Sequence, residues 1–189
     1  MNQMTPKKFG IGAPVRRKED PALITGTGRY TDDFAPEGTL HAYVLRSAMA
    51  HARISVSGLD ETRAHPGVAM VLTGADLDGM KPMPVKAVMK QLDGTMHWCP
   101  VRPVLCTDTV RHVGDAIAFV VADSVNAAKS AAELIEVDYE PLDVIVDIEE
   151  AAQDGATLVW PEHGTNKAFR LGHGDEAKTE EAFRKASHV

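Results

Sequence analysis

The alternation of apolar and polar residues predicts most of the strands of this chain. Residues 52–57 alternate strictly, which is typical of a strand with one buried face. Residues 116–122 are apolar almost throughout and indicate a strand covered on both faces, and residues 68–72 also form a buried strand. The predicted strands are residues 28–34, 40–46, 52–59, 68–72, 116–122 and 136–140. The first two can pair across the turn at Pro36-Glu-Gly38.

Helical periodicity is limited to shorter segments. The clearest helix, residues 125–135, follows the N-cap residues Asp123-Ser124 and has an inward face made of Ala128, Ala131, Ala132 and Ile135. Other helices are predicted at residues 60–65, 148–152 and 175–186. Residues 187–189 resemble the first residues of another strand, so we expect the chain to be a fragment that stops within an element.

The periodicity disappears between residues 76 and 104, which predicts a long loop. This stretch holds four methionines, and methionine fills irregular gaps and adaptable contact surfaces equally well. The loop therefore either packs on its own chain or faces a partner, and the sequence favours neither. The order of strands and helices is typical of an α+β fold in two layers and differs from a regular βαβ array.

Composition and charge describe an ordinary soluble protein. The chain has 189 residues, 44% of them apolar, and its 20 Lys and Arg against 27 Asp and Glu give a net charge of −7, which opposes nucleic-acid binding. No apolar run is long enough to span a membrane. Residues 1–18 form a basic arm without acidic residues, whereas residues 130–166 carry ten acidic residues and no Lys or Arg. The arm either lies on this acidic face or binds an external partner.

Most motifs that would carry chemistry are incomplete. Gly26-Thr-Gly28 lacks the third glycine of a dinucleotide loop and follows no strand, so it predicts a turn. Asp138 and Glu140 share one strand face, which we expect to be the solvated one. Cys99 and Cys106 are expected to be reduced thiols in the cytoplasm. They could form a zinc site with His97 and His112, but the spacing matches no usual zinc site.

Five blocks of sequence, in order, resemble a known family. The first is Arg17-Lys-Glu-Asp-Pro-Ala-Leu-Ile-Thr-Gly-Thr-Gly-Arg-Tyr-Thr-Asp-Asp33, and the fourth is Val110-Arg-His-Val-Gly-Asp-Ala-Ile-Ala-Phe-Val-Val-Ala122. The remaining blocks are residues 40–54, residues 66–68 with 71–76, and residues 131–142. Together they resemble the start of the large, molybdopterin-binding subunit of the xanthine dehydrogenase, aldehyde oxidase and carbon monoxide dehydrogenase family.

The resemblance implies an α/β-hammerhead domain, a mixed sheet with flanking helices. The expected organisation is an irregular amino-terminal arm at residues 1–22, the hammerhead domain at 23–155, and the start of a truncated molybdenum-cofactor-binding domain at 156–189. The parent enzyme would oxidise an aldehyde, an N-heterocycle or carbon monoxide with water as the oxygen source. Its molybdopterin would lie in the rest of the large subunit, and iron-sulfur clusters and FAD on partner polypeptides.

The family's Gly-Gly-Phe-Gly segments and its late glutamate base have no counterpart in this chain. We therefore assign no catalytic, cofactor-binding or metal-binding residue within it, and expect a scaffold and interface domain that is inactive alone and self-associates. The alternatives are a free-standing small-molecule binding module and a small Cys/His zinc protein. A further expectation is a positive φ at Gly114, before the buried strand.

Overall fold

The computed structural model describes residues 10–11, 13–84 and 88–188. The chain divides into two compact units, Met1–Thr39 and Leu40–Val189. The first unit contains helix α1 (Asp20–Ile24), which begins within the arm predicted to be irregular, and a 3-10 turn at Thr31–Asp33. The predicted strand at residues 28–34 is wrong. A side-chain oxygen of Asp33 accepts the Tyr30 amide at 2.8 Å and closes a turn, and no strand in the described residues pairs with this segment.

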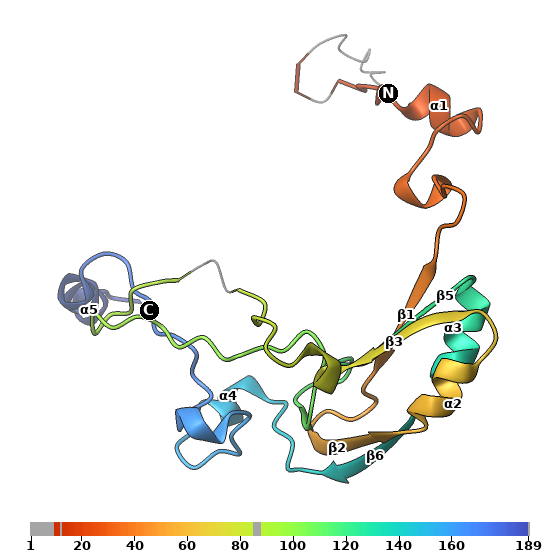
Figure 1. Cartoon of the computed structure of the whole chain (residues 1–189). Helices are drawn as coiled ribbons and strands as arrows, with labels where there is room; N and C mark the ends of the chain where they lie inside the picture. The colour runs from red at the N-terminus through yellow and green to blue at the C-terminus, as the bar shows by residue number, and fades with distance from the viewer. Residues whose placement is uncertain (1–9, 12, 85–87, 189) are drawn as a thin grey trace. The chain divides into compact units, whose positions relative to one another are not determined.

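The central strand of the first sheet is the predicted apolar run. Strand β5 (Ala116–Ala122) lies between β1 (His41–Arg46) and β3 (Val68–Thr73), and both neighbours are antiparallel to it. The three strands are labelled in Figure 1. The partner of β1 is thus β5, not residues 28–34 as predicted. Only Val71 and Thr73 of β3 are buried. They lie on one face of the strand, and Met70 on the other face is exposed, so the predicted full burial is wrong.

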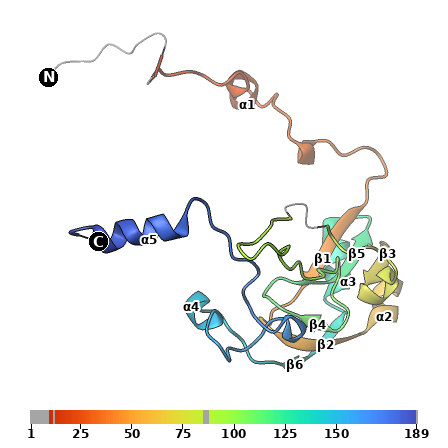
Figure 2. The ribbon, with the colours of Figure 1, turned by 90° about the vertical axis from the view of Figure 1, so that its left-hand side faces the viewer.

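The second sheet is built around the alternating run. Strand β2 (Ala52–Ser57) pairs antiparallel with β6 (Glu136–Pro141) and with the short strand β4 (Thr109–Val110), as Figure 2 shows. Asp138 and Glu140 on β6 are exposed, as predicted. The α+β class is confirmed, and its strands form two antiparallel three-stranded sheets where one mixed sheet was expected. Strand β4 was not predicted, because two residues carry no periodicity.

The helices of the second unit begin close to the predicted positions. In α3 (Val125–Ala132), Ser124 caps the helix by accepting the Ala127 amide at 3.2 Å, and the three alanines of the predicted inward face are buried. The helix ends three residues earlier than predicted, although Ile135 is still buried. Helix α2 (Leu59–Ala64) starts one residue early, after Gly58. Figure 1 shows α2 and α3 beside the β1–β5–β3 sheet.

Two apolar clusters occupy the two sides of β5. Val71, Ala118, Val120, Ala131, Ala132 and Ile135 form the cluster under α3. Ala52, Ile54, Cys106, Val110 and Ile117 form the cluster shared with the second sheet. Neighbouring side chains of a strand point to opposite faces, so Ile117 enters one cluster and Ala118 the other. The expectation that this strand is covered on both faces is confirmed at Ile117 and Ala118, whereas Phe119 and Val121, on the face of Ile117, are only half-buried.

The carboxyl-terminal part contains two helices that bury no residue. They are α4 (Ile148–Ala151) and α5 (Glu176–Lys185), where Asp175 accepts the Lys178 amide at 3.1 Å as an N-cap. Ser187 and His188 are not in a strand, contrary to prediction, and Val189 lies outside the described residues. No helix in the described ranges is long and apolar enough to cross a membrane.

Gly114 has the expected positive φ, at 94°. A Cβ at this position would have no atom within 4 Å, so a side chain would meet backbone strain without overpacking. The glycine holds a turn in which its amide donates to the Ser47 carbonyl at 2.8 Å, and the Ser47 amide donates to the Asp115 carbonyl at 2.8 Å. This turn fixes the end of β1 against the start of β5.

Candidate functional site

The two ends of the long loop between β3 and β5 lie against each other, at Gly74 and at residues 106–107. A Cβ on Gly74 would lie 2.7 Å from the Cys106 carbonyl oxygen and 2.9 Å from Thr107 Cα, so only glycine permits this backbone contact. Next to it, Asp76 accepts hydrogen bonds from the Thr73 amide at 2.7 Å and the Thr73 hydroxyl at 2.8 Å. These bonds hold the pKa of Asp76 below its usual value. We call the backbone contact between Gly74 and residues 106–107 the loop neck.

The far part of the loop packs against the carboxyl-terminal segment. The Trp98 ring stacks on His163 with 4.0 Å between centroids, and it contacts Trp160 edge-on at 5.8 Å. The Leu92 amide donates to the Arg170 carbonyl at 3.2 Å. Methionines of the loop remain exposed, among them Met80, Met83 and Met96. The loop therefore packs partly on its own chain and keeps adaptable apolar side chains at the surface.

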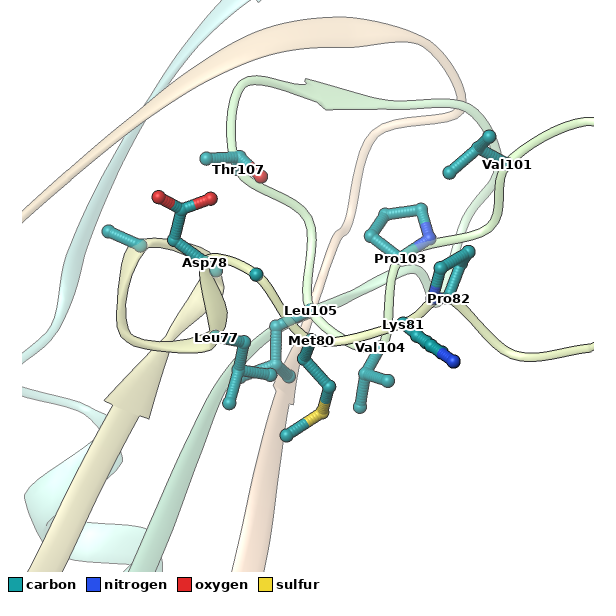
Figure 3. A pocket seen from close by; sticks show the side chains of 13 residues that line it. Leu77, Asp78, Met80, Lys81, Pro82, Val101, Pro103, Val104, Leu105 and Thr107 are labelled. Carbon is teal, nitrogen blue, oxygen red and sulfur yellow. The ribbon is translucent and has the colours of Figure 1, made fainter.

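An apolar pocket of about 420 Å³ opens beside the loop neck. Figure 3 shows Leu77, Met80 and Leu105 close together in its lining, with Asp78 and Thr107 away from them. The walls are two crossing parts of the same loop, residues 74–82 and 101–107. The charged side chains of the lining are Asp78 and Lys81, and most of the others are apolar, so the pocket suits contact with a largely apolar group.

A second pocket, of about 320 Å³, shares residues 101, 103 and 104 of its lining with the first. We call it the arginine pocket, because Arg46, Arg102 and Arg111 contribute to its lining together with Trp160. Arg111 lies over the Trp160 ring, with 5.5 Å from Cζ to the ring centroid. No pattern in the sequence predicts that these residues line one pocket, because they come from four separate segments of the chain.

The residues considered for zinc do not come together. His97 Nε2 lies 3.0 Å from Cys99 Sγ, but Cys106 is buried in the core and His112 pairs with Asp115 at 2.9 Å. No group of three or more His, Cys, Asp or Glu side chains in the described part could hold a metal. Burial raises the pKa of the Cys106 thiol to about 11, so this thiol is inert at neutral pH. The zinc alternative is therefore not supported.

Comparison with known proteins decides the family. The family model described as aldehyde oxidase and xanthine dehydrogenase, a/b hammerhead domain, matches residues 25–143. The chain belongs to this family. The predicted resemblance and the hammerhead fold are thereby confirmed.

Members of the aldehyde oxidase and xanthine dehydrogenase family with different names are similar to the chain to nearly the same degree. The carbon monoxide dehydrogenase large chain of Afipia carboxidovorans is 36% identical over 200 residues, which cover 97% of this chain and 23% of that one. The xanthine dehydrogenase molybdenum-binding subunit of Escherichia coli O157:H7 is 36% identical over 138 residues, covering 72% and 18%. The crystal structure of quinoline 2-oxidoreductase from Pseudomonas putida 86 has 37% identity and a TM-score of 0.63, covering 87% and 19%.

The chain spans about a fifth of the length of the curated relatives it matches. The chain is 36 or 37% identical to proteins named for carbon monoxide, xanthine and quinoline. Sequence identity therefore does not indicate which of these relatives shares its substrate with the parent enzyme. Several relatives are named as subunits or large chains, so the hammerhead domain occurs in multi-subunit enzymes of the family.

Proposed function

We propose that this chain is the hammerhead unit of the large subunit of a cytoplasmic, molybdenum-dependent hydroxylase. The whole enzyme would oxidise an aldehyde, an N-heterocycle or carbon monoxide, with water as the oxygen source. Within it the chain acts as a scaffold and interface domain. The observation that carries the proposal is the family match over residues 25–143, in relatives of which the chain covers only about a fifth.

The cofactor that the family implies is molybdopterin. The Gly-Gly-Phe-Gly segments with which the family holds the pterin have no counterpart in this chain. We therefore assign the cofactor to the rest of the large subunit, and iron-sulfur clusters and FAD to partner polypeptides. No chemical step is assigned to a residue of this chain.

The purified 189-residue chain is expected to contain no stoichiometric molybdenum, pterin or zinc. Elemental analysis and pterin fluorescence measure all three. Hydroxylase activity is expected only when the chain is joined to the remainder of the large subunit and its partner subunits. One molybdenum or one pterin per isolated chain would contradict the assignment of the cofactor, and one tightly held zinc would restore the zinc-protein alternative.

We also propose that the isolated chain self-associates. Helix α5 carries the apolar residues Ala182 and Phe183, with Ala186 directly after its end, and Phe183 is 54% exposed. Phe169 and Leu171 are exposed on the preceding segment. Covering such side chains is worth about 1.5–3 kcal/mol each, and a symmetric dimer is the commonest way to cover them.

Sedimentation at micromolar concentration is expected to show a dimer. The variant Phe183→Asp is expected to weaken the dimer at least tenfold, which corresponds to about 1.4 kcal/mol. The control Glu180→Gln changes an exposed residue of the same helix and is expected to leave the dimer intact. A wild-type chain that sediments as a clean monomer would show that the tail is solvated by itself.

A further inference from the structure

The arginine pocket is lined by three arginines, none of which forms an ion pair with a carboxylate of the described residues. Arg46, Arg102 and Arg111 contribute to a lining in which Asp115 is the only acidic residue. Within the described part, no Asp or Glu oxygen lies within 4 Å of a nitrogen of these three guanidinium groups. In a chain with a net charge of −7, this local excess of positive charge needs an explanation.

Both carboxylate oxygens of Asp115 already have hydrogen-bond partners. One of its oxygens accepts the Arg111 and His112 backbone amides at 2.6 and 3.2 Å, and the other lies 2.9 Å from His112 Nδ1. Its side chain is only 18% exposed. The carboxylate therefore shapes the turn between β4 and β5 and does not pair with the neighbouring arginines.

Two of the guanidinium groups are held in place by the protein itself. Arg46 Nη1 donates to the Gly114 carbonyl at 2.9 Å, and Arg111 Nε donates to the Val159 carbonyl at 3.3 Å while its Cζ lies over the Trp160 ring. A guanidinium has five N–H donors, so each group keeps free donors after these bonds. Arginines oriented in this way lose little conformational freedom when they bind a planar or tetrahedral anion.

We propose that the arginine pocket binds the oxyanion group of a small molecule, a carboxylate or a phosphate. Charge-assisted hydrogen bonds from the guanidinium groups would hold the anion, as they commonly do for both groups. Trp160, Met83 and Val104 in the lining offer apolar contact to the rest of the ligand. A volume of about 320 Å³ suits a small ligand. This inference does not rest on the proposed function, because binding requires neither molybdenum nor the rest of the enzyme.

The test is a titration of the full 189-residue chain with inorganic phosphate, benzoate and, as a neutral probe, benzyl alcohol. Amide NMR signals of Gly114, Asp115 and Trp160 report occupancy of the pocket. Saturable shifts with phosphate or benzoate, weakened by added salt, are expected, and benzyl alcohol is expected to shift these signals much less. A response to phosphate alone assigns the pocket to phosphorylated ligands, and a response to benzoate alone assigns it to carboxylates.

Three variants locate the site. Arg102→Gln removes a side chain without a hydrogen bond in the described residues, so the fold is expected to persist while the dissociation constant rises about tenfold. Arg46→Gln is expected to act in the same direction. Arg53→Gln on β2 has the same change of charge outside the pocket and is expected to leave binding unchanged. The proposal would be overturned if Arg102→Gln and Arg46→Gln bind the anions as tightly as the control Arg53→Gln, or if neither anion gives a saturable shift.

Discussion

Replacing Gly58 by alanine is expected to lower the free energy of unfolding by about 3 kcal/mol or more. Gly58 has a φ of 73°, and an added Cβ would lie 2.3 Å from the Leu134 carbonyl oxygen. That oxygen belongs to the backbone between α3 and β6, so no side-chain rotation can relieve the clash. Gly58 also accepts hydrogen bonds from the Thr62 amide and hydroxyl, which start helix α2. The variant must therefore displace either α2 or the end of α3.

The matched control is Gly155→Ala. Gly155 has a similar φ of 81°, but a Cβ there would have no atom within 4 Å. Its loss is expected to be about 1 kcal/mol, from backbone strain alone. Thermal and urea unfolding of both variants separate the steric clash from the backbone strain. If Gly58→Ala lowers the free energy of unfolding no more than Gly155→Ala does, the backbone contact between Gly58 and Leu134 is not tight.

Truncating Ile117 to alanine is expected to destabilise the second unit by about 2–5 kcal/mol. Ile117 on β5 is 0% exposed and is the largest of the fully buried side chains. It packs with Ile54, Cys106 and Val110, so the truncation leaves a cavity between the two sheets. For a chain of this size, a loss of 3 kcal/mol corresponds to a fall in Tm of about 6–12 °C.

Ile148→Ala removes the same atoms from a residue that is 83% exposed at the start of α4. Little change in stability is expected for it, because no buried contact is lost and alanine is the better helix former. Differential scanning calorimetry compares the two truncations directly. If both variants melt with the wild type, β5 does not carry the shared core that the structure assigns to it.

The elements that the sequence predicts correctly are those whose burial is visible in a local repeat. Alternation marks β2 and β6, the apolar run marks β5, and a capping serine followed by inward alanines marks α3. The strand predicted at residues 28–34 has the same β-favouring residues, but strand formation also needs a partner. The Asp33 hydrogen bond to Tyr30 supplies a local alternative that composition does not reveal.

Sheet order and the arginine pocket depend on contacts between distant parts of the chain. A hairpin between neighbouring runs is the simplest expectation, yet β1 pairs with β5, whose partner residues lie 70 to 81 positions further along the chain. The same pairing brings the end of β1, and with it Arg46, next to the turn at Gly114. No spacing rule connects Arg46, Arg102 and Arg111, so one sequence without its relatives could not have revealed this cluster. Family resemblance supplied the fold without these details.

The loop neck has a consequence for how such domains diverge. Because the backbone of Gly74 touches Cys106, the ends of the loop are fixed to each other independently of what lies between them. Doubling the length of a flexible loop adds only about 0.6 kcal/mol of closure entropy, and the pairing of β3 with β5 lies outside the loop. Insertions and deletions between these ends are therefore expected to leave the pairing within both sheets unchanged.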